Sequence, residues 1–320
     1  MSEIKKVQKK LQKEYGNKVK VQLQDGVLTL TGELDTWEEK LEAGRLCVNQ
    51  KKYSLVNDIK CKSGDKTKML LPEIQDKSLE GKSFDVLIIG AGIIGCAAAR
   101  ELSRYKLKIG VVEKYGDLAM MASSRNDGML HPGIDLKPGS QKHKYNNQGN
   151  SMYEKICQEL GVDFRYTGQI ICFDKKPWKL LLPLLTPYWN RILKVPCKYL
   201  NAKEVKKREP ELNENICCGL YYPTAGVVCP YGLSIAYGEN ASDNGAEFFF
   251  NTAVTGMKMK DGEIKSLTTN RGEIYAKTVI NAAGVFSDDV AQMAGDRFFS
   301  IYPRRGSNTI LDKKASQLRR

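Results

Sequence analysis

The chain has 320 residues, of which 42% are hydrophobic and 27% charged, a composition typical of a globular protein with two domains or three small ones. It has no apolar run long enough to cross a membrane, and its N-terminus is polar, so we expect neither a transmembrane segment nor a secretory signal. The formal net charge of +13 is spread along the chain and forms no single basic stripe, which argues against nucleic acid as a partner and suits an anionic substrate and cofactor.

The nine cysteines are an odd number and lack the spacing of metal ligands. This pattern predicts reduced thiols, a cytoplasmic protein and no metal site. We interpret the adjacent Cys217 and Cys218 as a partly buried hydrophobic pair in preference to a redox pair.

Residues 1–62 predict a small module with the order helix, strand, strand, helix, strand. Asp25-Gly26 is a hairpin turn signal between the first two strands. Asp35-Thr36, followed by acidic residues, marks the start of the second helix. The apolar residues expected on the helices are Val7, Leu11 and Tyr15 on the first, and Leu41, Leu46 and Val48 on the second.

This module resembles a BON domain in two stretches, DGVLTLTGELDTWEEK at 25–40 and VNDIK at 56–60. The resemblance implies a binding or interaction module without catalytic residues, so a protein partner is expected there. A generic α/β cap or a dimerisation element would show the same pattern. Residues 63–83 lack a periodic pattern, and we interpret them as a linker to the next domain.

A nucleotide-binding signature occupies residues 84–114, FDVLIIGAGIIGCAAARELSRYKLKIGVVEK. An apolar strand leads into Gly90, Gly92 and Gly95, spaced G-x-G-x-x-G, and a helix and a second strand follow. In such a turn the first glycine permits the tight bend, the second lets the backbone approach a pyrophosphate, and the third allows helix and strand to pack closely. The helix N-terminus offers N–H groups and a positive dipole end to the phosphates.

Glu113 ends the second strand, 18 residues after Gly95. A carboxylate at this place can accept hydrogen bonds from ribose hydroxyl groups and disfavours a 2′-phosphate, so NADP is not expected. The signature by itself does not distinguish FAD from NAD.

Two later stretches distinguish them through a family resemblance, namely MASSRNDGMLHPGIDLKPGS at 121–140 and TVINAAGVFSDDVAQMAGD at 278–296. With the glycine signature they resemble the D-amino-acid-oxidase-like superfamily of FAD enzymes, over residues 84 to about 312. The groups concerned are FAD-dependent glycerol-3-phosphate dehydrogenases and 2-hydroxyglutarate dehydrogenases. Their S-x-N-x-G-x-x-H-x-G pattern matches Ser124, Asn126, Gly128, His131 and Gly133.

The resemblance implies FAD as the cofactor and a role for each matching position. His131 is implied to lie near the flavin ring as part of the catalytic base or of its hydrogen-bond chain, and a purely structural hydrogen-bonding role is the alternative. The other implied contacts are Ser123, Ser124 and Arg125 at the pyrophosphate or ribityl chain, Asn126, Gly128 and Met129 at the flavin ring, the backbone of Val254 at the adenine, and Ala282, Ala283 and Gly284 against the ADP part.

Arg304 and Arg305 enter a predicted last strand and are candidates for binding an anionic substrate, with surface charges as the alternative.

The predicted fold class is α/β: an FAD/NAD(P)-binding Rossmann-like three-layer domain with an inserted α+β substrate domain, preceded by the small αββαβ module. We assign 84–150 and 246–320 to the FAD-binding domain and 151–245 to the substrate domain. In the substrate domain, residues 178–193 are expected to form an apolar helix broken by prolines. Compared with the family pattern, the FAD-binding domain is expected to be incomplete at its C-terminus.

These patterns favour an FAD-dependent dehydrogenase that transfers a hydride from a small anionic secondary alcohol, such as glycerol 3-phosphate, to flavin N5. Oxygen, a quinone or a partner protein would accept the electrons. Three alternatives stay open: oxidation of a 2-hydroxy acid of the 2-hydroxyglutarate type, oxidation of an amine or amino acid, and a non-catalytic truncated nucleotide-binding fragment.

Overall fold

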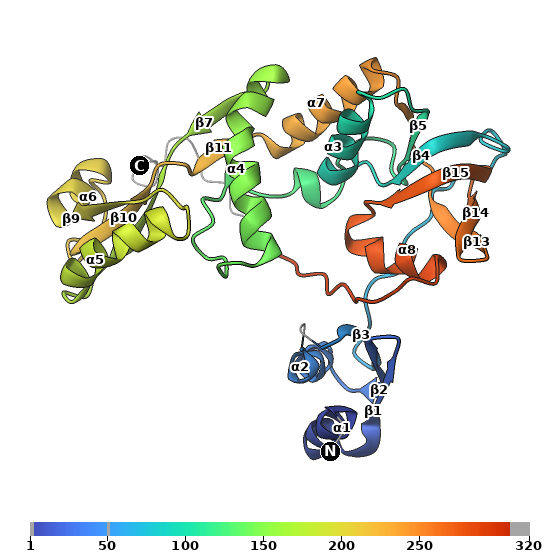
Figure 1. Cartoon of the computed structure of the whole chain (residues 1–320), viewed down its shortest axis with the longest axis horizontal. Helices are drawn as coiled ribbons and strands as arrows, with labels where there is room; N and C mark the ends of the chain where they lie inside the picture. The colour runs from blue at the N-terminus through green and yellow to red at the C-terminus, as the bar shows by residue number, and fades with distance from the viewer. Residues whose placement is uncertain (1–2, 50–51, 308–320) are drawn as a thin grey trace. The chain divides into compact units, whose positions relative to one another are not determined.

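The computed structural model describes residues 3–49 and 52–307 (Figure 1). The described residues form two compact units, one built from residues up to 120 together with 241–306, and the other from residues 121–240. The chain returns to the first unit within the last turn of helix α7 (Pro230–Asp243). The predicted domain end at 308–320 lies outside the described residues.

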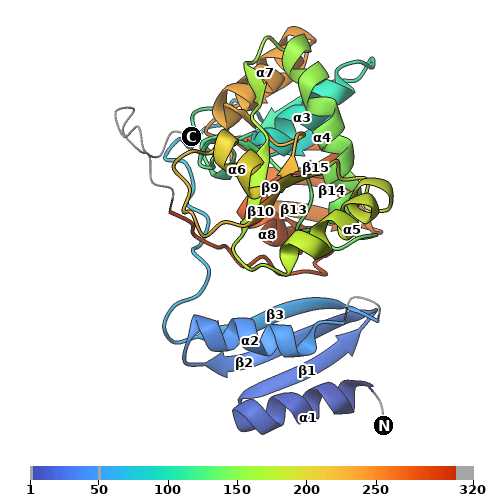
Figure 2. The same ribbon diagram turned by 90° about the vertical axis from the view of Figure 1, so that its left-hand side faces the viewer.

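The N-terminal module of the first unit has the element order predicted from the sequence (Figure 2). Strand β2 lies between β1, to which it is antiparallel, and β3, to which it is parallel. A core that includes Val7, Leu11, Leu28, Leu30 and Ile59 joins sheet and helices. The elements are α1 (Glu3–Tyr15), β1 (Val19–Gln24), β2 (Val27–Leu34), α2 (Trp37–Cys47) and β3 (Ser54–Cys61).

Local chemistry explains where these elements begin and end. Asp25 and Gly26 have φ values of 49° and 77°, the left-handed conformation that a two-residue type I′ turn needs. Thr36 and Glu39 form a capping box, in which each side chain accepts a hydrogen bond from the other residue's N–H. The prediction for Val48 was wrong: α2 ends at Cys47, and Val48 is an exposed, extended C-cap, since the buried face of the helix ends with Cys47.

The second half of the predicted linker is bound to the sheet that follows it. The N–H of Leu79 donates to the Arg271 carbonyl at 3.0 Å, and that of Gly81 donates to the Glu273 carbonyl at 2.9 Å. The Leu79 side chain is buried in the core of that sheet. Residues 76–81 therefore form part of the folded unit.

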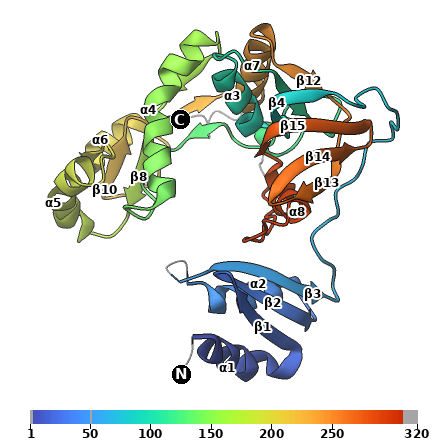
Figure 3. The same cartoon turned by 45° about the vertical axis from the view of Figure 1, so that its right-hand side comes forward.

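A six-stranded sheet dominates the rest of the first unit, in the order β12-β5-β4-β15-β14-β13 (Figure 3). Strands β12, β5, β4 and β15 are parallel to one another, whereas β14 is antiparallel to both β15 and β13. The strands are β4 (Ser83–Ile89), β5 (Ile109–Val112), β12 (Glu247–Phe249), β13 (Val254–Lys260), β14 (Glu263–Thr269) and β15 (Gly272–Asn281).

The order of strands and helices brings three strand ends together. Helix α3 (Ile93–Leu102) connects β4 to the parallel strand β5, and helix α8 (Ser287–Met293) follows β15. Ile89 pairs with Val112 of β5 and with Asn281 of β15. Because neighbouring parallel strands end at the same edge, the residues after β4, β5 and β15 are neighbours, at the edge where such sheets bind ligands.

The second unit contains two antiparallel three-stranded sheets, β8-β10-β9 and β6-β11-β7. Its strands are β6 (Met129–Leu130), β7 (Phe164–Tyr166), β8 (Gln169–Phe173), β9 (Lys198–Asn201), β10 (Cys218–Tyr222) and β11 (Gly226–Val228). Its helices before α7 are α4 (Gln141–Glu159), α5 (Trp178–Arg191) and α6 (Ala202–Arg208).

The expectation of a proline-broken helix at 178–193 was wrong. Helix α5 runs without interruption from Trp178 to Arg191, with Pro183 and Pro187 inside it. The fixed φ of proline is compatible with helical geometry, so each proline costs a backbone hydrogen bond without ending the helix here. Between residues 3 and 307, leaving aside 50 and 51, no helix combines the length and apolar character needed to span a membrane.

Candidate cofactor site

The turn from β4 to α3 can be built only with glycine at two of its positions. Gly90 has a φ of 104°, and a Cβ atom there would lie 2.5 Å from the Ala282 carbonyl oxygen. A Cβ atom on Gly95 would lie 1.9 Å from the Gly90 carbonyl oxygen. Gly92 is the N-cap of α3 and has no side chain to cap the first turn. The start of α3 can therefore be approached closely by an anionic group.

Glu113 lies directly beside this turn. Its Oε2 atom accepts a hydrogen bond from the Ala91 N–H at 2.8 Å, and its Oε1 atom accepts one from the Tyr115 N–H at 2.9 Å. A carboxylate has about four acceptor positions, so two further donors can be bound. The carboxylate predicted for the ribose thus lies within hydrogen-bonding distance of the glycine turn.

The segment that enters β13 is fixed beside Glu113. The Thr252 N–H donates to the Glu113 carbonyl at 2.8 Å. Asn270 holds the same segment, because its Oδ1 accepts from the Ala253 N–H at 2.7 Å and its Nδ2 donates to the Asn251 carbonyl at 2.9 Å. Val254, which begins β13, is buried directly after this segment.

Ala282, Ala283 and Gly284 follow β15 at the same edge. The Ala282 N–H donates to the Ile89 carbonyl at 3.0 Å, which places this turn against Gly90. Gly284 has a φ of 55° and starts a short 3₁₀ turn, Gly284–Phe286, that leads into α8. The first unit thus assembles Gly90, Gly92, Gly95, Glu113 and the turn at 282–284 around one sheet edge.

Helix α8 is anchored by the buried carboxylate of Asp288. Asp288 Oδ2 accepts from the Ile301 N–H at 2.9 Å, and Lys66 forms an ion pair with Asp288 and with Asp289. Burial by itself raises the pKa of Asp288, but the Ile301 N–H and the Lys66 ammonium outweigh it, so the pKa lies below its usual range. Asp288 is therefore ionised and ties α8, which follows the 282–284 turn, to Lys66 and Ile301.

The second unit holds the loop that carries the other predicted cofactor residues. Ser123 and Ser124 lie in a 3₁₀ turn, Ala122–Ser124. The Asn126 side chain donates to the Ala122 and Ser123 carbonyls, both at 3.1 Å, and accepts from the Gly128 N–H at 2.9 Å. Asn126 thus fixes the shape of the loop. The neighbouring Arg125 and Met129 side chains are exposed.

Gly128 and His131 are positioned by contacts within the second unit. A Cβ atom on Gly128, whose φ is 66°, would lie 2.1 Å from the Val228 carbonyl oxygen. The His131 carbonyl accepts from the side-chain amides of Asn146 at 3.2 Å and Asn150 at 3.1 Å, whereas its imidazole is exposed. The loop backbone is therefore well fixed, and the imidazole has access to solvent.

The prediction that Arg304 and Arg305 enter a strand was wrong. Residues 301–307 form no strand, and both arginines are exposed. The groups that precede them bind elsewhere: the Ser300 hydroxyl accepts from the Asn57 N–H at 2.9 Å, and the Ile301 N–H binds Asp288. With these bonds to side chains and to β3, the segment has no ladder with a neighbouring strand.

Some positioning residues were not found from the sequence. Asn270, Asn146 and Asn150 each bind carbonyls or N–H groups that lie far from them in the chain. The only sequence signal for Asn270 is its place in the turn TTNRG before β15, and no motif indicates the two asparagines of α4.

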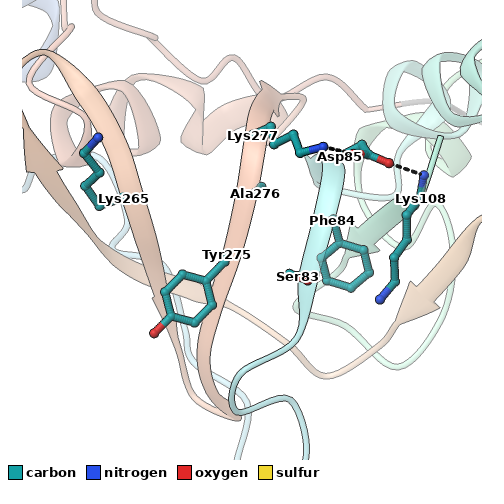
Figure 4. Close-up of a pocket in the computed structure, with 8 residues that line it drawn as sticks. All are labelled: Ser83, Phe84, Asp85, Lys108, Lys265, Tyr275, Ala276 and Lys277. Atoms are coloured by element: carbon teal, nitrogen blue, oxygen red, sulfur yellow. Dashed lines mark hydrogen bonds and ion pairs between the residues drawn. The ribbon is translucent and has the colours of Figure 1, made fainter.

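A pocket of about 330 Å³ lies at the opposite edge of the six-stranded sheet (Figure 4). It is lined by residues at the start of β4 and in the first half of β15, where the Asp85 carboxylate accepts from Lys277 Nζ at 2.7 Å and from the Lys108 N–H at 2.8 Å. This pocket is separate from the glycine turn, since it lies at the other end of β4.

Within the described ranges, no group of three or more His, Cys, Asp or Glu residues is arranged to hold a metal ion.

The glycine turn, the acidic residue after the next strand and the small-residue turn after the third strand define a dinucleotide-binding α/β protein of the Rossmann-like type. The model of the DAO family, described as FAD dependent oxidoreductase, matches residues 85–320, and the chain belongs to this family. The predictions of a Rossmann-like fold and of FAD as the cofactor are thereby confirmed.

Individual relatives are similar over the same region. The glycerol 3-phosphate dehydrogenase of Caloramator mitchellensis is 38% identical over 238 residues, which are 73% of this chain and 49% of that protein. The mitochondrial L-2-hydroxyglutarate dehydrogenase of Homo sapiens is 29% identical over 238 residues, 68% of this chain and 50% of that protein. The chain spans about half the length of these curated relatives.

Among solved structures, the dithionite-reduced L-α-glycerophosphate oxidase of Mycoplasma pneumoniae with FAD bound has a TM-score of 0.61 and 32% identity. The match covers 67% of this chain and 57% of that chain.

Proposed function

We propose that the protein is an FAD-dependent dehydrogenase that oxidises glycerol 3-phosphate or a similar small anionic secondary alcohol. The observation that carries this proposal is the arrangement of Gly90, Glu113 and the 282–284 turn at one sheet edge, in a chain of the DAO family. The choice of substrate is supported by the named activities of the relatives from Caloramator mitchellensis and Mycoplasma pneumoniae.

In this proposal the first unit holds the ADP part of the cofactor. The first turn of α3 binds the pyrophosphate, the Glu113 carboxylate accepts hydrogen bonds from the ribose, and the Val254 backbone contacts the adenine. Ala282, Ala283 and Gly284 let the ADP part approach the sheet because their side chains are small or absent.

The loop of the second unit serves the flavin end in the same proposal. Ser123, Ser124 and Arg125 contact the pyrophosphate or ribityl chain, and Asn126, Gly128 and Met129 line the ring. The exposed His131 imidazole takes the hydroxyl proton of the substrate, or belongs to the hydrogen-bond chain that does so. When bound, FAD supplies the acceptor for the hydride that leaves the carbon atom.

Arg304 and Arg305 are proposed to attract the anionic substrate. Both side chains are exposed and positively charged, so they can supply a guanidinium for a phosphate or carboxylate. A 2-hydroxy acid of the 2-hydroxyglutarate type is the second candidate substrate, because the human relative carries that activity in its name.

The N-terminal module is proposed to be a BON-like domain that binds a protein partner. Its αββαβ order and its capping box support the assignment. The nine free thiols support a reducing, cytoplasmic location.

The test is an anaerobic titration of the FAD-loaded protein with glycerol 3-phosphate, L-2-hydroxyglutarate and a neutral amino acid, followed by visible absorbance. We expect glycerol 3-phosphate to bleach the flavin bands. If only the 2-hydroxy acid or only the amino acid bleaches the flavin, that compound class is the substrate in place of glycerol 3-phosphate. If none of the three compounds bleaches the flavin bands, the proposed activity is contradicted.

The His131→Ala variant should keep its bound flavin, and glycerol 3-phosphate should bleach that flavin roughly a hundredfold more slowly, because a general base contributes about two to four orders of magnitude to the rate.

A further inference from the structure

Helix α5 in the second unit presents a large apolar face to solvent. Leu180 and Leu184 are 76% and 72% exposed, and Tyr188 continues the same helical row at i+4 spacing. Of this helix, which is described throughout, only Leu182 is buried. The other exposed apolar side chains of this region are Leu181, Leu185 and Ile192.

The two faces of α5 are clearly different. Trp178, Leu182 and Trp189 face inward, where they pack with the core beneath β9 and β10. The outward row is therefore not needed to hold the helix in place. Single exposed apolar residues are common on protein surfaces, but a contiguous apolar patch marks an interaction site.

The stretch of chain between Asp174 and Glu204, which contains α5, carries only positive charge. Residues 175–203 contain seven Lys or Arg residues and no Asp or Glu, whereas the chain average of 37 acidic residues in 320 would give about three in this stretch. All seven basic side chains are exposed: Lys175, Lys176, Lys179, Arg191, Lys194, Lys198 and Lys203.

We propose that α5 and its basic flanks bind this protein to the surface of an anionic lipid bilayer. An exposed apolar row that ends in a tyrosine, flanked by cations, is the chemistry of helices that lie in the plane of a membrane interface. Leu180, Leu184 and Tyr188 would enter the headgroup boundary, and the lysines would contact anionic headgroups. The helix has 14 residues, which is too short to span a bilayer.

Charge favours a bilayer over a second copy of the chain as the occupant of this face. Two copies that met through α5 would bring two stretches of seven positive charges together, and like charges oppose such contact. An anionic bilayer is both apolar and negatively charged, so it complements both features of the face. The proposal does not depend on the flavin chemistry.

The experiment is co-sedimentation of the full chain with vesicles of phosphatidylglycerol and phosphatidylcholine, compared with vesicles of phosphatidylcholine alone. We expect the wild type to bind the anionic vesicles preferentially. The Leu180→Ser/Leu184→Ser variant should bind at least tenfold more weakly, because it removes two apolar side chains from the contact. The Lys175→Gln/Lys176→Gln/Lys179→Gln variant should lose roughly fivefold per charge.

The matched control is Leu70→Ser/Leu71→Ser, which changes two leucines that are 75% and 51% exposed in another part of the chain. This control should bind like the wild type, and all variants should keep the wild-type unfolding midpoint because the changed side chains are exposed. Wild-type protein that fails to bind the anionic vesicles would overturn the proposal. Equal loss of binding in the control would also overturn it. A wild-type dimer that Leu180→Ser/Leu184→Ser converts to a monomer, without vesicle binding, would assign the face to a second copy instead.

Discussion

At the residue scale, the Glu113 carboxylate both shapes the glycine turn and offers hydrogen-bond acceptors beside it. We expect Glu113→Ala to weaken FAD binding by roughly tenfold to a hundredfold, because a hydrogen bond to a charged group contributes about 1.5–3 kcal/mol. Glu113→Gln keeps one acceptor oxygen, so its FAD affinity should lie between those of the wild type and Glu113→Ala. Quenching of flavin fluorescence during an FAD titration measures the affinity.

The control for this prediction is Glu263→Ala. Glu263 is an exposed residue of β14, paired with Lys265, and should not affect FAD affinity. If Glu113→Ala binds FAD as tightly as the wild type, the ribose does not contact this carboxylate.

Burial makes most of the thiols unreactive. It raises the pKa of Cys96 to about 12 and that of Cys218 to about 11. The Sγ atoms of Cys217 and Cys218 lie 3.7 Å apart, at the distance of a thiol hydrogen bond, and form no disulfide. Cys229 is the one exposed cysteine among the nine, all of which are described. We therefore expect one fast thiol with Ellman's reagent at neutral pH, absent in Cys229→Ser. Two or more fast thiols in the native protein would contradict this burial.

At the scale of elements, the packing of α3 on β4 depends on Gly95. A Cβ atom there would meet the Gly90 carbonyl at 1.9 Å, so Gly95→Ala should destabilise the protein by about 1–3 kcal/mol, the usual cost of overpacking. The midpoint of urea unfolding measures the effect. Gly149 of α4 has open space around its Cα, so Gly149→Ala is the matched control and should stabilise α4 by up to about 1 kcal/mol. A Gly95→Ala protein as stable as the wild type would mean that α3 is placed differently.

The stability that the Asp288 carboxylate contributes to helix α8 should depend on pH. The pKa of Asp288 is lower in the folded state than its ordinary value of 3.8, so its contribution is complete above that pH and is lost as the pH falls through the lower folded value. Asp288→Asn should cost roughly 2 kcal/mol at pH 7, the order of magnitude of hydrogen bonds to a charged group. Thermal unfolding at pH 7 and near pH 3 tests this: the difference between wild type and variant should shrink in acid. A difference that stays constant would show that the Asp288 charge is not involved.

Much of the first unit could be predicted because its signals are local. The G-x-G-x-x-G spacing, the Asp25-Gly26 turn and the start of α2 at Thr36 each depend on neighbouring residues, and the structure has them as expected. The failures involve contacts that are distant in sequence. The binding of Ile301 to Asp288 keeps Arg304 out of a strand, and this contact leaves no mark on the local pattern.

The prediction of a proline-broken helix at 178–193 failed for a different reason. Two internal prolines normally indicate a helix end, yet packing of Trp178, Leu182 and Trp189 on the core beneath β9 and β10 holds one continuous helix. Tertiary packing thus outweighs a local preference. The exposure of the opposite leucines could not be predicted either, since an apolar residue in a helical pattern is usually assigned to the core.

At the scale of the whole molecule, the predicted cofactor residues are divided between two compact units. The first contains the glycine turn, Glu113, Val254 and the 282–284 turn, and the second contains the loop from Ser123 to His131. Each set is fixed by contacts within its own unit. The residues proposed for the ribose and the adenine therefore lie in the first unit, and those proposed for the flavin ring lie in the second.

The central claim is that the sheet edge at Gly90 binds FAD. The most direct measurement is the visible absorbance of the purified chain after addition of FAD and removal of free cofactor by gel filtration. The account predicts flavin bands that elute with the wild type and with Gly149→Ala but not with Gly90→Val, whose side chain would clash with the Ala282 carbonyl. A folded wild-type protein that elutes without flavin bands would contradict it.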